Sequence, residues 1–108
     1  MNIFKIINLK NGVLSNSDTC IRLDVKLELQ KDNLVQDIVQ IYFNNKAFID
    51  IGWYPIEFEI TKESFFLVRI CSDGNWDNLV YEKRCKSIEK LVTMIEEAII
   101  FTSQFQKV

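Results

Sequence analysis

Hydrophobic and polar residues alternate along much of the chain, and this pattern predicts antiparallel β-strands. The clearest example is 20–30 (CIRLDVKLELQ), where apolar side chains occupy every second position from Ile21 to Leu29. A period of two directs one set of side chains into a core and the other set into water, as in a half-buried strand. We therefore expect residues 20–30 to form a strand.

Turn-forming residues divide the neighbouring sequence into further strand candidates. Asn11-Gly12 follows the apolar stretch 2–9, and this dipeptide indicates a hairpin because both residues tolerate positive φ. The other strand candidates are 34–43, 47–53, 56–60, 64–72 and 76–84. Short strands at this spacing predict a meander, an antiparallel sheet of about five to seven strands.

Two of these candidates carry more specific expectations. In 56–60 (IEFEI), the apolar side chains should face the core and the two glutamates should face solvent. The segment 34–43 (LVQDIVQIYF) also fits a helix that would begin at Asp32 or Asn33. Its β-branched and aromatic residues favour a strand, so we expect a strand there.

The spacing of apolar residues changes at Ser87, where repeats of three and four residues predict an amphipathic helix over 87–105. Ser87 is suited to the N-cap, and Glu89 lies in the first turn, where the helix dipole favours a negative charge. The side chains expected to be buried against the sheet are Leu91, Val92, Ile95 and Ile99. Met94 and Phe101 widen this stripe on one flank, and Ile100 lies nearly opposite it. Strands followed by one packed helix predict an α+β fold.

Length and composition indicate a single domain over residues 1–108. The chain is 48% hydrophobic and 26% charged, which is ordinary globular usage. Cys20, Cys71 and Cys85 are widely spaced and form no ligand pair, so we expect reduced thiols rather than a disulfide framework or a zinc site. The polar residues in 1–12 interrupt any signal-peptide core, and no apolar run is long enough to span a membrane. We therefore expect a cytoplasmic protein.

No catalytic apparatus is recognisable in the sequence. Histidine is absent, which removes the usual general base and the commonest transition-metal ligand. The three glycines form no phosphate-binding loop, so no nucleotide or other cofactor is indicated. We expect a non-enzymatic protein without a cofactor or metal, which acts by binding another molecule.

Acidic and aromatic residues gather in the middle of the chain. Residues 47–80 contain six acidic against two basic side chains, a net charge of −4 within a chain of net charge −2, together with seven of the thirteen aromatics. Aromatic anchors ringed by carboxylates suit a basic protein partner, because the rings supply contact area and the charges steer association. The candidate partner-binding residues are Asp50, Trp53, Tyr54, Glu57, Glu59, Asp73, Trp76 and Asp77. Alternatively, these aromatics belong to the core and the carboxylates only keep one sheet face solvated.

Four short elements follow one another in the second half of the chain: Asp50-Ile51-Gly52-Trp53-Tyr54-Pro55, then 64–70 (SFFLVRI), then Asp73-Gly74-Asn75-Trp76-Asp77, and then the helix that begins at Ser87. Together they resemble small bacterial immunity proteins, the antidotes of polymorphic toxins such as those of contact-dependent growth inhibition. The resemblance covers 47–102 and leaves the N-terminal half unmatched. It implies neutralisation of a cognate toxin, often a basic nuclease domain, by 1:1 binding, with no direct contact to nucleic acid or membrane.

Two other classes of protein remain open. A small acidic secretion chaperone would bind an effector segment through apolar surface, for which Met94, Ile100 and Phe101 are the best candidates. A ligand-binding or enzymatic domain would need a deep pocket, which Trp53, Trp76 and nearby carboxylates could line.

Overall fold

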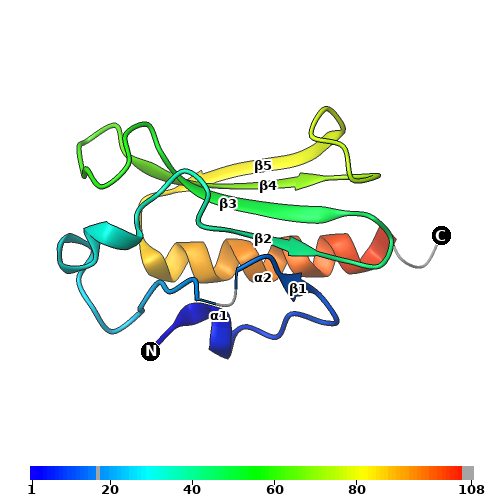
Figure 1. The fold of residues 1–108 in the computed structure, drawn as a ribbon, viewed down its shortest axis with the longest axis horizontal. Helices are drawn as coiled ribbons and strands as arrows, with labels where there is room; N and C mark the ends of the chain where they lie inside the picture. The colour runs from blue at the N-terminus through cyan, green and yellow to red at the C-terminus, as the bar shows by residue number, and fades with distance from the viewer. Residues whose placement is uncertain (17, 106–108) are drawn as a thin grey trace.

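The protein is a five-stranded antiparallel sheet with one long helix packed on it, which confirms the α+β prediction (Figure 1). The computed structural model describes residues 1–16 and 18–105. The strands follow one another in the sheet in sequence order: β1 (Val13–Leu14), β2 (Val39–Tyr42), β3 (Phe48–Tyr54), β4 (Phe65–Cys71) and β5 (Leu79–Cys85). The helices are α1 (Ile3–Ile6), the 3-10 turns η1 (Leu27–Leu29) and η2 (Lys31–Asn33), and α2 (Ile88–Phe105). Within the described part of the chain, no helix is long and apolar enough to cross a membrane.

The C-terminal helix forms where the periodicity predicts it. Ser87 caps α2, because its Oγ accepts a hydrogen bond of 3.2 Å from the Lys90 amide. The α2 side chains that are fully or almost fully buried against β3, β4 and β5 are Leu91, Ile95, Ala98, Ile99 and Thr102. Val92 is only half-buried, and Met94, expected on the flank, is buried as well. Ile100 is 50% exposed on the opposite side of the helix, as expected.

Strand parity gives the sheet two different faces. Alternate residues of β3 and β4 join the core beneath α2: Ile49, Ile51, Trp53, Phe66, Val68 and Ile70. The residues between them point to the other side, which we call the outer face. No described helix covers the outer face (Figure 1).

Residues 20–30 form no strand, so the clearest alternation in the sequence predicts the wrong structure. The segment makes a single bridge between Arg22 and Asn2 and then turns through η1. The cause is Gln30, which is 6% exposed and whose side-chain amide takes the place of a neighbouring strand. Its Oε1 accepts from the Arg22 amide, and its Nε2 donates to the carbonyls of Arg22 and Val25, at 2.8–2.9 Å. Leu29 consequently lies 76% exposed instead of in a core.

The expected strand at 56–60 is also wrong. Ile56 and Phe58 are each 51% exposed, and Phe58 has a φ of 66°, which is incompatible with an extended strand. Pro55 has no N–H for a sheet ladder, so the chain leaves β3 and forms a loop over 55–64. Glu57 is exposed as expected, but its carboxylate accepts a hydrogen bond of 2.7 Å from the Gln36 amide.

The N-terminal segment contains a helix turn instead of the first strand of a hairpin. Asn2 caps α1 by accepting a hydrogen bond of 3.1 Å from the Phe4 amide. The following turn places Lys10 and Asn11 at positive φ, one residue earlier than the expected pair. Gly12 is needed for close approach, because an added Cβ would lie 2.6 Å from a side-chain atom of Ile41 on β2.

The ambiguous segment 34–43 is a strand in its second half, β2, and is not helical in its first half. Its first half still follows β3, since the Val35 carbonyl accepts from the Trp53 amide at 2.8 Å. The backbone at Gln36 passes directly over Gly52, where an added Cβ would lie 1.9 Å from the Gln36 carbonyl oxygen. Only glycine permits this crossing.

Candidate functional site: the outer face of the sheet

An ion pair between a buried carboxylate and a half-buried arginine lies at the centre of the outer face. Gln40, Asp50 and Arg69 are direct neighbours in the registers of β2, β3 and β4. The Asp50 carboxylate, 1% exposed, accepts one hydrogen bond from Arg69 Nη2 at 2.8 Å and one from Gln40 Nε2 at 2.9 Å. Asp50 therefore organises the face from beneath, and it has almost no surface that a partner could contact.

Arg69 is held between two aromatic rings on this face. Its guanidinium carbon lies 6.0 Å from the Tyr54 ring centroid and 5.7 Å from that of Trp76, and its Nη2 donates to the Tyr54 hydroxyl at 3.2 Å. Burial alone would lower the pKa of Arg69, but the hydrogen bond and charge of Asp50 outweigh it and raise that pKa. Burial raises the pKa of the Tyr54 hydroxyl, and the carboxylates of Asp50 and Asp37 raise it further against the charge of Arg69.

Further ring contacts extend this arrangement across the sheet. The Phe48 ring contacts Trp76 edge-on at 4.7 Å and Tyr42 at 5.6 Å. On the other side, Phe65 stacks on Tyr54 at 6.1 Å. We call the whole set the outer-face cluster: Tyr42, Phe48, Tyr54, Phe65, Arg69, Trp76 and Arg84, whose guanidinium lies 4.3 Å from the Phe65 centroid.

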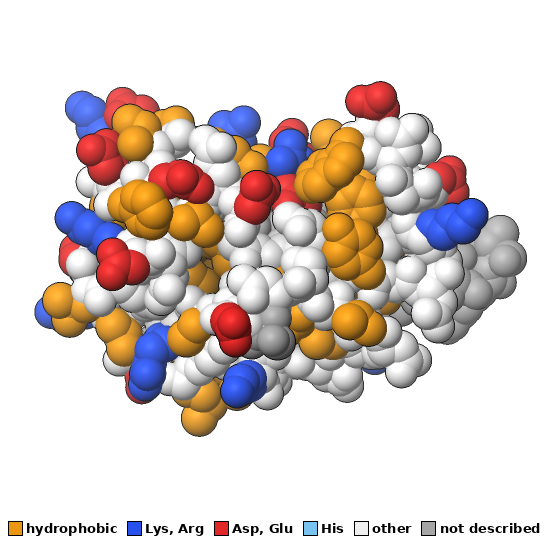
Figure 2. Space-filling model, viewed as in Figure 1, with side chains coloured by type: hydrophobic (Ala, Val, Ile, Leu, Met, Phe, Trp, Pro, Cys, Tyr) orange, Lys and Arg blue, Asp and Glu red, His pale blue; other side chains and the backbone are white. Residues whose placement is uncertain are grey.

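Part of the outer-face cluster is open to solvent. Trp76 is 50% and Tyr42 is 47% exposed, whereas Phe48 beneath them is buried. Figure 2 shows a group of hydrophobic side chains over the right-hand part of the sheet, with acidic and basic side chains beside it. An exposed aromatic patch with a charged border is a feature of protein interaction sites.

The predicted acidic residues lie at the two ends of this face and not in one group. Glu57 and Glu59 belong to the 55–64 loop after β3, and Asp73 and Asp77 belong to the turn between β4 and β5. Seven residues of strand separate the two ends, a distance of about 20 Å. All four carboxylates are exposed, in contrast to Asp50.

Trp53 does not belong to the outer face. It is 1% exposed in the core beneath α2, contacts Phe66 edge-on at 4.8 Å, and donates from Nε1 to the Glu59 carbonyl at 2.9 Å. Trp53 and Trp76 therefore point to opposite sides of the sheet and cannot line one pocket. Of the eight candidate residues, Tyr54 and Trp76 join the outer-face cluster, four carboxylates border it, and Asp50 and Trp53 are buried.

Five members of the outer-face cluster were missed as binding candidates: Tyr42, Phe48, Phe65, Arg69 and Arg84. Strand parity contains the signal for Arg69, because Val68 and Ile70 on either side of it fit the core. Phe48 and Phe65 follow from the same parity, since they lie two positions before Asp50 and Leu67. Arg84 and Tyr42 require the strand register, which the sequence does not specify.

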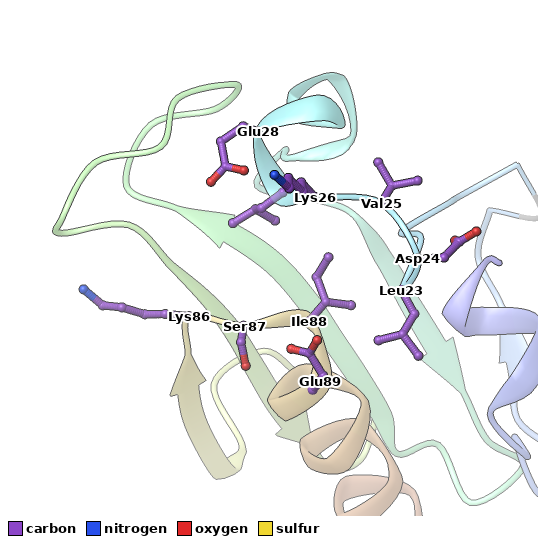
Figure 3. Close-up of a pocket in the computed structure, with 10 residues that line it drawn as sticks. Leu23, Asp24, Val25, Lys26, Glu28, Lys86, Ser87, Ile88 and Glu89 are labelled. Atoms are coloured by element: carbon purple, nitrogen blue, oxygen red, sulfur yellow. The ribbon is translucent and has the colours of Figure 1, made fainter.

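Two open hollows lie on the surface of the described residues, one of them on the outer face. One of about 420 Å³ lies between the 23–28 loop and the start of α2 (Figure 3). Charges of both signs surround it, from Asp24, Lys26, Lys86 and Glu89, without converging on one point (Figure 3). Another, of about 490 Å³, lies at the Phe65 end of the outer face.

The thiols and carboxylates form no visible chemical centre in the described residues. Cys20, Cys71 and Cys85 are unpaired and separate, and burial raises the pKa of the Cys71 and Cys85 thiols. Among residues 1–16 and 18–105, no group of three potential ligands could hold a metal ion.

Comparisons of this chain with protein-family models, with curated proteins and with solved structures find no match.

Proposed function

We propose that this protein is an immunity protein that neutralises a cognate toxin domain by 1:1 binding through its outer face. The observation that carries the proposal is the outer-face cluster, an aromatic and arginine surface that no described helix covers. Tyrosine, tryptophan and arginine are the residue types that contribute most to binding at protein interfaces.

The rigidity of this face supports a binding role. Arg69 is fixed by Asp50 and by the Tyr54 hydroxyl, and Trp76 is supported by Phe48 and Arg69. Side chains that are already ordered lose little conformational entropy when a partner docks. Trp76 and Tyr54 can therefore act as preformed anchors.

The charges around the face support a basic partner. The loops at its two ends carry Glu57, Glu59, Glu63, Asp73 and Asp77 against a single Lys62, all exposed. Since Asp50 and Arg69 neutralise each other, the acidity of the middle of the chain lies entirely in these loops. A basic nuclease domain would approach faster and be oriented by this field.

A secretion chaperone is the second candidate, and Ile100 is the observation that favours it. This side chain is 50% exposed on α2, on the side away from the sheet. Met94, expected to contribute to the same apolar surface, is only 8% exposed, which leaves less apolar surface on α2 for an effector segment.

One pair of variants distinguishes the two candidates. Trp76→Ala and Ile100→Ala remove side chains of equal exposure from opposite sides of the molecule. With the toxin encoded by the neighbouring gene, we expect Trp76→Ala to weaken binding by roughly thirtyfold or more and Ile100→Ala to leave it nearly unchanged. Calorimetric titration measures both, and the reverse ranking would contradict the proposal.

The acidic border is tested by charge reversal. Glu59→Lys with Asp77→Lys changes both ends of the outer face without touching the hydrogen-bonded Glu57 carboxylate or Asp73, whose φ is 58°. Lys5→Glu with Lys31→Glu, two exposed positions without positive φ, is the control. We expect the first pair to slow association several-fold and reduce its salt dependence, because rim charges act mainly on the association rate. Equal association rates for both pairs would show that the acidic loops do not face the toxin.

A further inference from the structure

The strand β5 leaves one edge of the sheet open. Its seven residues pair with β4 only, and no other described segment forms a backbone hydrogen bond with it. Figure 1 shows β5 along the upper edge of the sheet, with no described helix or strand beyond it. Such an edge presents unpaired N–H and C=O groups that can pair with another strand.

Two side chains of opposite charge lie on the same face of β5. Glu82 and Arg84 both point to the outer face, since they lie opposite Arg69 and Leu67 in the register with β4. Neither has an ion-pair partner within 4.0 Å among the described residues. Lys83 between them points to the α2 side, where its Nζ lies 3.7 Å from the Glu97 carboxylate.

We propose that two copies of this chain associate through antiparallel pairing of β5 with β5, around a two-fold axis at Lys83. Glu82 of each copy then lies opposite Arg84 of the second copy, which gives two equivalent charge pairs on the outer face. Tyr81 lies opposite Cys85 of the second copy on the α2 side. The two sheets then form one continuous ten-stranded sheet. Because both copies use the same strand in this isologous interface, association through β5 stops at the dimer.

The two adjacent symmetric registers each place like charges of the outer face directly opposite each other. Pairing centred on Glu82 places two glutamates directly opposite each other, and pairing centred on Arg84 does the same with two arginines. Like charges in direct cross-strand pairs are destabilising. The register at Lys83 has one like-charge contact, and each lysine there is already paired with Glu97 of its own helix.

This dimer goes beyond the proposed toxin binding and does not depend on it. Sedimentation equilibrium of the purified chain from micromolar to millimolar concentration measures it without a toxin. We expect a monomer–dimer equilibrium. Glu82→Arg and Arg84→Glu alone each replace two attractive pairs with two repulsive ones, so each should raise the dissociation constant roughly tenfold or more. The double variant restores both pairs and should return it close to that of the wild type.

A covalent measurement tests the register directly. Lys83→Cys places two exposed thiols directly opposite each other across the two-fold axis, so mild oxidation should give a disulfide-linked dimer. Leu79→Cys lies outside this pairing and is the control. A monomer at every concentration would overturn the proposal. So would a double charge variant as dissociated as the single variants, or equal cross-linking of the two cysteine variants.

Discussion

Replacing Arg69 with methionine should destabilise the protein more than any conservative change to its partner Asp50. Among the described residues, the substitution removes the one charged partner of Asp50, a carboxylate that is 1% exposed and would retain the Gln40 amide. Leaving a charge buried without its partner costs about 3–5 kcal/mol. Asp50→Asn is milder, since Arg69 is 29% exposed and keeps access to water. Converting one charge-assisted hydrogen bond to a neutral one should cost about 1–2 kcal/mol.

Urea unfolding followed by far-ultraviolet circular dichroism measures these free energies. The two positions are direct register neighbours, so the double variant Asp50→Asn with Arg69→Met should cost less than the sum of the single variants. Our account predicts a difference of about 2 kcal/mol between Arg69→Met and Asp50→Asn. If Arg69→Met costs less than Asp50→Asn, the carboxylate does not depend on the arginine and the pair does not organise the outer face.

Three other predictions concern the backbone and the thiols. Gly52→Ala should cost about 3 kcal/mol of stability, because the new Cβ would lie 1.9 Å from the Gln36 carbonyl oxygen. Gly74→Ala should cost only about 1–2 kcal/mol, because its φ of 66° is the only strain. Equal losses of stability in thermal melts would contradict the close approach at Gly52. Lys46→Gly should raise stability by about 0.5–1 kcal/mol because Lys46 has a φ of 69°, with Lys62→Gly as the control that should not stabilise. Iodoacetamide at pH 8 should label Cys20 well before Cys71 and Cys85, because burial raises the pKa of the latter two thiols. Mass spectrometry of peptides measures the labelling rates, and equal rates would contradict the burial of Cys71 and Cys85.

The parts of the fold that could be predicted are those where local pattern and tertiary packing agree. The helix from Ser87 combines a cap with an apolar stripe, and β3 and β4 combine β-branched and aromatic residues with flanking turns. Residues 20–30 show why alternation alone is insufficient. Their pattern is that of a strand, but the buried Gln30 amide forms hydrogen bonds with the backbone of the same segment. A hydrogen bond made by a single side chain leaves no periodic signal in the sequence.

The candidate site was only partly predictable for a related reason. Acidity and aromatic content indicated the part of the chain that contains most of the outer-face cluster, but not which side of the sheet each residue occupies. Asp50 and Trp53 look like exposed binding residues in the sequence, yet Arg69 and the Glu59 carbonyl allow both to be buried. Such pairing between strands depends on register, which adjacent residues in the sequence do not reveal.

The two tryptophan indole signals in a ¹H–¹⁵N spectrum report directly on whether the partner docks on the outer face. Trp76 is 50% exposed on the outer face, and Trp53 is 1% exposed beneath α2, so the chain carries a probe on each side of the sheet. On titration with the cognate toxin domain, we predict that the Trp76 indole signal shifts or broadens at a 1:1 ratio while the Trp53 signal stays in place. A saturated complex in which the Trp76 signal is unchanged would contradict the account.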